Sequence, residues 1–263
     1  MPAIMTRLKT DQIRAYYHTL FSMWGCQHWR PAHSRFEVIL GAYLTQNTSW
    51  INVEKALASL RTARLLSVHG IRRTPLRRLE NLIRSSGYFR QKAQRLKTFV
   101  RFLDERYDGS LTRMFAQPVM KLREELLAVN GVGPETADSI LLYAGNQPVF
   151  VVDAYTRRIL ERHALIGSRA TYDEIRELFE QALAPIGAHA SGYAAKLGPA
   201  HLTAGPRGTS HSPSRMSQAS RPPLSQVFNE MHGLLVGVGK NYCLKSQLRC
   251  EECPLQKFLP DKS

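Results

Sequence analysis

Apolar residues recur at intervals of three and four along most of the chain, a spacing that places them on one face of a helix. No stretch shows the strict alternation of apolar and polar residues that a half-buried strand requires. The pattern therefore predicts an all-α protein. The predicted helices cover residues 36–44, 50–60, 75–83, 92–107, 119–129, a segment that starts at Asp153 and runs through Leu160, and 172–183.

A glycine turn, Gly131–Val132–Gly133, separates two of these helical patterns. Pro134 follows where the second helix should begin, a position that tolerates a residue without an N–H. Two short helices joined in this way leave backbone N–H groups at a helix N-terminus, where dipole and donors together favour a phosphate. Gly-x-Gly is also common in ordinary turns, so the turn alone leaves both interpretations open.

Asp153 follows an apolar run and precedes a further helical pattern. Aspartate is a favoured N-cap residue, so a purely structural role explains its position. A helix N-terminus also lowers the pKa of a carboxyl group and keeps it ionised, as a catalytic carboxylate requires. The two roles are compatible, and both stay open at this point.

The charge balance favours a polyanionic partner, because the chain has 36 Lys and Arg residues but only 21 Asp and Glu residues, which gives a net charge of +15. Many of the basic residues are interleaved with one helical pattern, as on a folded face that follows phosphates. They are Arg72, Arg73, Arg77, Arg78, Arg84, Arg90, Lys92, Arg95 and Lys97.

No stretch approaches the roughly 20 apolar residues that span a bilayer, and the N-terminus lacks the apolar run of a signal peptide. We therefore expect a cytoplasmic protein that does not bind membranes. In a reducing compartment its four cysteines favour metal binding or isolated thiols over disulfides. Residues 198–223 are rich in Gly, Pro, Ser and His and contain no acidic residue, which predicts a disordered basic insertion.

Three segments together resemble the helix-hairpin-helix (HhH-GPD) DNA glycosylases of the endonuclease III superfamily. They are the glycine turn with Asp153 about twenty residues later, the segment Leu44–Thr48, and the C-terminal cysteines. The resemblance implies a two-lobed helical fold that holds double-stranded DNA with a damaged base in the cleft between its lobes, as a monomer. It places the central lobe at 35–147 and builds the second lobe from 1–34 and 148–263.

The resemblance also assigns roles to individual residues. Asp153 would be the catalytic carboxylate, which stabilises the oxocarbenium-like transition state and orients or deprotonates a water molecule. Gln46 would fill the gap that the flipped base leaves. The other residues implied in DNA binding are Gly131, Val132, Gly133, Thr136 and Lys240.

Glu135 decides the expected reaction subtype. Bifunctional relatives carry a lysine at this position, and its amine forms a Schiff base with the sugar. A carboxylate cannot do so, and we therefore expect a monofunctional enzyme that uses water. Adenine-removing relatives have a catalytic acid four residues before Gln46, where this chain has Ala42, which argues against that activity.

The remaining pattern resembles the bacterial 3-methyladenine glycosylases of the endonuclease III type. Trp24 and Trp29 lie in an aromatic segment before the first core helix and would form the base pocket with Glu135. A cationic alkylated purine stacks well between electron-rich rings. The tryptophans could equally be packing residues, and two other functions stay open: a glycosylase for oxidised pyrimidines, and a non-catalytic DNA-binding module.

Cys243, Cys250 and Cys253 match the first three ligands of the family's [4Fe–4S] loop. The fourth position is Leu259, which cannot ligate iron. The resemblance therefore implies either a labile cluster with three protein ligands or no cluster.

Overall fold

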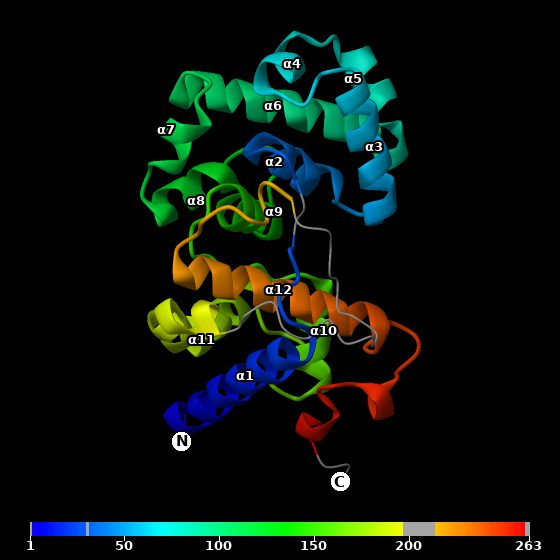
Figure 1. Cartoon of the computed structure of the whole chain (residues 1–263). Helices are drawn as coiled ribbons and strands as arrows, with labels where there is room; N and C mark the ends of the chain where they lie inside the picture. The colour runs from blue at the N-terminus through cyan, green and yellow to red at the C-terminus, as the bar shows by residue number, and fades with distance from the viewer. Residues whose placement is uncertain (1, 30–31, 197–213, 261–263) are drawn as a thin grey trace. The chain divides into compact units, whose positions relative to one another are not determined.

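The computed structural model describes residues 2–29, 32–196 and 214–260, and within them the fold is α-helical, as predicted (Figure 1). The α-helices are α1 (Pro2–Trp24), α2 (Arg35–Leu44), α3 (Trp50–Thr62), α4 (Val68–Arg73), α5 (Leu76–Leu82), α6 (Phe89–Tyr107), α7 (Leu111–Phe115), α8 (Val119–Leu127), α9 (Pro134–Ser139), α10 (Ala154–Arg162), α11 (Tyr172–Lys196) and α12 (Pro223–Asn241). Short turns of other helix types are η1 (Arg84–Ser86), the π-helix η2 (Ile140–Ala144), η3 (Cys250–Glu252) and η4 (Gln256–Phe258).

The chain divides into two compact units, which are described separately. The central unit is Ala32–Gly145, and the terminal unit combines Met1–Pro31 with Asn146–Ser263. The lobe expected at 35–147 differs from the central unit by three residues at its start and two at its end. None of the described helices is long and apolar enough to cross a membrane.

In the central unit, α2 is the buried helix, and every residue from Phe36 to Leu44 is shielded from solvent. Its start is fixed by a reciprocal cap: the Ser34 hydroxyl accepts from Glu37 N at 3.1 Å, and the Glu37 carboxylate accepts from His33 N at 2.9 Å. The amphipathic helix α6 packs its buried face, which includes Phe99 and Leu103, against α2 and its neighbours. The loop that contains Gln46 therefore leaves a helix that is held at its start and along its length.

In the terminal unit, α12 packs against α1, α10 and α11. Phe150 fills the space beside these helices: its ring stacks on Phe179 at 4.2 Å between centroids and meets Phe228 edge-on at 5.7 Å. Residues 149–152 are buried and lie outside any helix, and they lead directly to Asp153. The apolar run before Asp153 is thus a core segment that fixes where the carboxylate lies.

Three expectations about the terminal unit need correction. The pattern analysis did not predict α1, and the helix expected at 172–183 extends to Lys196. The segment predicted to be disordered is ordered from Ser214 onward, because Met216 is only 7% exposed and Arg221 donates to Met216 O at 2.7 Å and to Asn146 Oδ1 at 3.0 Å. The rest of that segment, 198–213, lies outside the described residues.

Candidate active site

Asp153 is the N-cap of α10, which confirms the predicted start of this helix. Its Oδ1 accepts from Thr156 N at 2.8 Å, and its Oδ2 lies 3.4 Å from His232 Nε2. The side chain is 13% exposed. Burial alone would raise the pKa of Asp153, but attraction to His232 and the hydrogen bonds from His232 and Thr156 outweigh it, so the pKa lies below its usual value. The carboxylate is therefore ionised, with a hydrogen bond at Oδ1 and a close contact with His232 at Oδ2.

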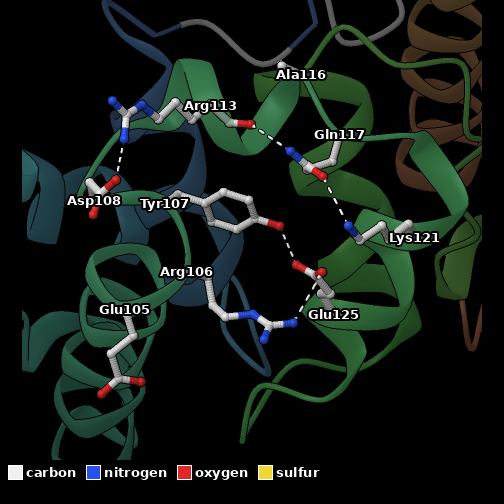
Figure 2. A pocket seen from close by; sticks show the side chains of 9 residues that line it. All are labelled: Glu105, Arg106, Tyr107, Asp108, Arg113, Ala116, Gln117, Lys121 and Glu125. Atoms are coloured by element: carbon white, nitrogen blue, oxygen red, sulfur yellow. Dashed lines mark hydrogen bonds and ion pairs between the residues drawn. The ribbon is translucent and has the colours of Figure 1, made fainter.

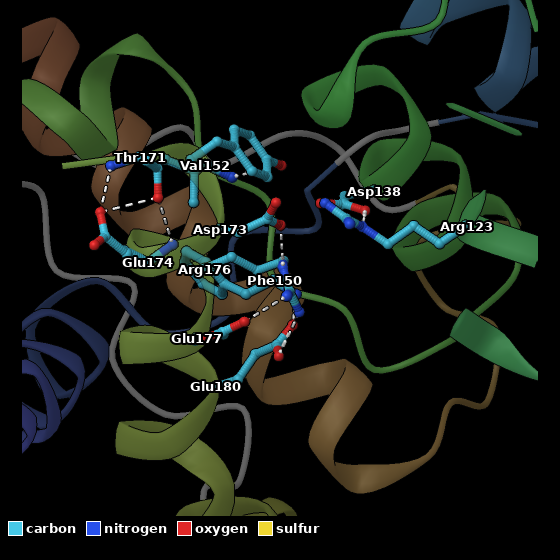
Figure 3. Close-up of polar contacts among 11 residues, drawn as sticks. Arg123, Asp138, Phe150, Val152, Thr171, Asp173, Glu174, Arg176, Glu177 and Glu180 are labelled. Carbon is cyan, nitrogen blue, oxygen red and sulfur yellow. Dashed lines mark hydrogen bonds and ion pairs between the residues drawn. The ribbon is translucent and has the colours of Figure 1, made fainter. Parts of the chain in front are cut away.

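The backbone before Asp153 is tied to α11 by side chains (Figure 3). Phe150 N donates to Glu180 Oε1 at 3.0 Å, and Val152 N donates to the Tyr172 hydroxyl at 3.3 Å. Arg176 in turn holds Glu180 at 2.8 Å. These contacts fix the direction in which the chain enters α10, and therefore the direction of the Asp153 carboxylate.

Of the two tryptophans expected in a base pocket, Trp29 lies close to Asp153. His232, on α12, meets the Trp29 ring edge-on, with 5.5 Å between centroids and 62° between planes. Gly233 makes this approach possible, because a Cβ there would lie 3.2 Å from the Trp29 Cβ. Trp29 is 8% exposed and also serves as a packing residue. Trp24 instead stacks on Tyr242 at 6.3 Å, at the end of α1.

The hairpin lies in the central unit and joins α8 to α9. Gly131 has a φ of +84°, and a Cβ there would lie 2.4 Å from the Arg95 side chain, so this position requires glycine. Gly133 is the N-cap of α9, and Pro134 occupies the first turn, as predicted. Val132 is buried and its N–H donates to Val129 O at 3.0 Å. The expectation that the turn leaves its amides free therefore fails at Val132, which anchors the turn.

A buried ion pair braces the two hairpin helices (Figure 3). Arg123 of α8 donates to Asp138 of α9 through Nε at 2.7 Å and through Nη2 at 3.2 Å. Their side chains are 8% and 0% exposed. This two-pronged geometry fixes both the distance and the rotation of one helix relative to the other.

The Gln46 side chain is bonded to the hairpin through its amide nitrogen and to α6 through its amide oxygen. Its Nε2 donates to Gly131 O at 3.0 Å and to Thr136 Oγ1 at 2.9 Å, and its Oε1 accepts from Arg95 at 2.6 Å. The loop expected to support the DNA gap and the hairpin expected to hold the backbone are therefore parts of one hydrogen-bonded network. The exposed tip of the loop is the next residue, Asn47, whose φ is +53°.

A family model described as the HhH-GPD superfamily base excision DNA repair protein matches residues 40–185, more than half of the chain. The match includes the Gln46 loop, the hairpin and Asp153. The chain belongs to the HhH-GPD superfamily of base excision DNA repair proteins. It is therefore a DNA glycosylase of this family.

Individual relatives agree with this assignment. A protein of Methanocaldococcus jannaschii, provisionally named a DNA repair glycosylase, is 37% identical over 260 residues, which cover 98% of this chain and all of the relative. Endonuclease III of Thermotoga maritima is 32% identical over 155 residues, 56% of this chain and 65% of that protein.

Two solved structures have similar folds. The H. pylori 3-methyladenine DNA glycosylase bound to 1,N6-ethenoadenine superposes with a TM-score of 0.65 and 26% identity, over 88% of this chain and 97% of that one. A trapped covalent complex of endonuclease III with DNA has a TM-score of 0.67 and 21% identity, over 95% and 94% of the chains, and supports the fold alone.

In the glycosylase, Glu135 is exposed in the first turn of α9. A buried amine of the central unit is Lys92, which donates to Leu44 O at 2.9 Å and to Ser86 O at 2.6 Å. Burial, with a smaller effect of Arg95, lowers its pKa to about 8. Because Lys92 is 1% exposed, it cannot meet a substrate, and its contacts instead join the Gln46 loop to the turn after η1.

That turn carries an exposed aromatic residue that the motif analysis missed. Tyr88 is 68% exposed, has a φ of +46° and is the N-cap of α6. Ser85 donates to Asn52 O at 3.0 Å and ties this turn to the start of α3. The available signal in the sequence was an aromatic residue directly after Gly87, between basic residues.

The three cysteines lie in the C-terminal loop of the terminal unit. Cys243 is buried, and its sulfur accepts from Arg162 of α10 at 3.1 Å. Within the described part of the chain, no three His, Cys, Asp or Glu side chains are arranged to hold a metal ion. With an aliphatic side chain at Leu259 and a guanidinium on Cys243, the donor set does not fit a four-thiolate cluster. Lys240, expected to contact DNA, is exposed in the last turn of α12.

A cavity of about 650 Å³ in the central unit is lined by charged side chains of α6, α7, α8 and their connections (Figure 2). Glu125 accepts from the Tyr107 hydroxyl and pairs with Arg106 at 3.3 Å, and Asp108 pairs with Arg113. Acidic and basic groups balance along its wall, so the cavity does not favour a phosphate. None of the predicted site residues lines it.

Proposed function

We propose that this glycosylase removes alkylated purines from double-stranded DNA by water attack and leaves the DNA strand intact. The observation that carries the proposal is the fixed, ionised carboxylate of Asp153, with the Trp29 ring one side chain away across His232. In this proposal the carboxylate stabilises the sugar cation, and the Trp29 ring supports the base.

The reaction requires little beyond this carboxylate. The bond between the sugar C1′ and the purine nitrogen breaks, and its electron pair leaves with the base. A cationic alkylated purine thereby departs as a neutral molecule, so no acid has to protonate it. The bond that forms joins C1′ to a water oxygen, and the water proton passes to Asp153 or to solvent. Asp153 stabilises the positive charge that develops on the sugar between these events.

Two findings support a purine that carries positive charge. A tryptophan ring attracts a cation in addition to stacking on it. The H. pylori relative, 26% identical over 88% of this chain, is named a 3-methyladenine DNA glycosylase and was solved with 1,N6-ethenoadenine. The two tryptophans therefore have different roles. Trp29 would support the base, while Trp24 packs against Tyr242.

The lack of strand cleavage is proposed because Glu135 takes the place of the Schiff-base lysine. Lys92, the buried amine of the same unit, is committed to two backbone carbonyls. The exposed carboxylate of Glu135 has no amine and so cannot form the Schiff base with the sugar on which strand cleavage depends. The acid instead suits the first turn of a helix.

DNA binding is assigned to the central unit. The first turn of α9 and the Gly131–Gly133 hairpin offer backbone donors to a phosphate. Asn47 and Tyr88, both exposed at left-handed positions, are the side chains that can enter the base stack. Gln46 would position the loop in the free protein, because filling the gap itself would break three hydrogen bonds, two to the hairpin and one from Arg95. Each such bond contributes roughly 1 kcal/mol.

The test is a panel of duplexes that each contain one lesion, with base release and strand cleavage scored separately. Alkylated purines should be released faster than thymine glycol, and nicks should appear only after alkali. Asp153→Asn should lose roughly 10²-fold or more in base release but retain duplex affinity. Glu161→Gln, an acid-to-amide change on the same helix, is the matched control and should keep full activity. If oxidised pyrimidines are released faster than alkylated purines, the proposed substrate class is wrong. If Asp153→Asn remains active, Asp153 is not the catalytic carboxylate.

A further inference from the structure

A buried histidine contacts the catalytic carboxylate that the proposed function invokes. His232 is 1% exposed, and its Nε2 lies 3.4 Å from Asp153 Oδ2. The other carboxylate oxygen accepts from Thr156 N at 2.8 Å. We propose that His232 is a positioning residue that holds the plane of the Asp153 carboxylate for base excision. The inference rests on the proposed role of Asp153.

The physical reason is that one hydrogen bond cannot fix a carboxylate. The bond from Thr156 N holds Oδ1 but leaves the group free to rotate about the line that joins them. A second contact at Oδ2 removes that freedom, and the oxygen that faces the sugar then has one position. Preorganised charge of this kind stabilises a transition state without reorganisation during the reaction.

The imidazole itself is fixed by its neighbours. The Trp29 ring packs on it at 5.5 Å and 62°, and the Phe150 ring lies 6.4 Å away at 75°. The Trp29 and Phe150 rings belong to segments that are also buried. A shift of the base-supporting tryptophan would therefore reach Asp153 through His232, which couples the pocket wall to the reacting group.

Three charged groups on the surrounding helices have other partners. On α12, Glu230 accepts from Gln27 N at 2.7 Å. On α10, Arg158 donates to Cys243 O at 2.8 Å. On α11, Glu180 accepts from Phe150 N at 3.0 Å and pairs with Arg176. The contact that lowers the pKa of Asp153 most is attraction to His232, ahead of the bonds from Thr156.

The experiment measures single-turnover base release against pH for the full-length protein. His232→Phe keeps a ring of similar shape but cannot donate, and His232→Gln keeps a donor. In His232→Phe, the limb of the profile where activity falls at acid pH should move to higher pH, with a loss of about tenfold or more at neutral pH. His232→Gln should restore part of both effects. Duplex affinity should stay within about twofold, since no phosphate contact changes.

His163→Phe is the matched control. His163 is a buried histidine of the same unit that bonds the Tyr16 hydroxyl at 2.7 Å, not Asp153. It should lower thermal stability without moving the acid limb. The inference is overturned if the acid limb of the pH–rate profile does not move in His232→Phe and His232→Gln. It is also overturned if His163→Phe moves that limb by the same amount. Asp153→Asn in the same series separates the two proposals: if it stays active, the catalytic assignment fails first.

Discussion

The buried Arg123–Asp138 pair should dominate the stability of the hairpin. Removing one partner leaves the other charge buried and unpaired, at a cost of about 3–5 kcal/mol. Either Arg123→Met or Asp138→Leu should therefore consume a large part of the 5–15 kcal/mol that typically separates a folded domain from its unfolded state. The double variant replaces the pair with apolar groups and should cost far less than the sum, by at least about 3 kcal/mol.

The measurement must report on the central unit alone. The chain has three tryptophans, and only Trp50 lies in this unit, with its ring over Gly41. In a background with Trp24→Phe and Trp29→Phe, the fluorescence of Trp50 follows urea unfolding of the central unit without a signal from the terminal unit.

A surface pair provides the control for this cycle. Arg101 and Glu105 lie 4.0 Å apart on α6 with side chains 69% and 66% exposed, so Arg101→Met should cost less than about 1 kcal/mol. The reasoning is refuted if Arg123→Met costs no more than Arg101→Met, or if the double variant costs the full sum of its two single changes. Each single variant should also bind duplex DNA more weakly, even at temperatures below the melting temperature of that variant.

Three further predictions concern the terminal unit. Burial raises the pKa of Glu230 from 4.5 to about 7. Between these two pH values the folded state binds more protons than the unfolded state, so the free energy of unfolding should fall by about 3 kcal/mol as pH rises through this interval. Glu230→Gln should remove most of that loss, as urea unfolding at pH 5 and pH 8 would show. Iron bound after anaerobic purification should be substoichiometric or lost in air, while Leu259→Cys should increase iron retention; four stable irons in the wild type would mean that another ligand exists. Gly233→Ala should displace Trp29 and lower the rate for alkylated purines more than duplex affinity, which parallel assays would show.

Much of the helical fold could be predicted because local patterns determine it. The cap at Asp153 and the first-turn proline, Pro134, depend on neighbours three or four residues away. The α1 helix was not predicted even though Ile13, Tyr16 and Leu20 have helical spacing, because charged residues lie around them and make the apolar face less evident.

The contacts that assemble the site could not be read from local patterns. Gln46 meets partners 85 and 90 residues away in the chain, and the two oxygens of Asp153 are contacted by residues from different helices. His232 lies among apolar residues of α12, where a single histidine looks like a core residue. Long-range proximity of this kind is set by packing, so its residues become visible only after the fold is known.

The capping and catalytic roles of Asp153, open alternatives in the sequence, have the same physical cause in the structure. The N–H of Thr156 that the carboxylate caps is also one of the contacts that lower the pKa of Asp153, so a stable helix start and an ionised carboxylate, as the proposed catalytic role requires, are one arrangement. At the far end of α10, Arg162 donates to Cys243 and to Leu244 O at 2.7 Å, which anchors the helix to the C-terminal loop. A helix secured at both ends can hold a carboxylate in place while a base is removed.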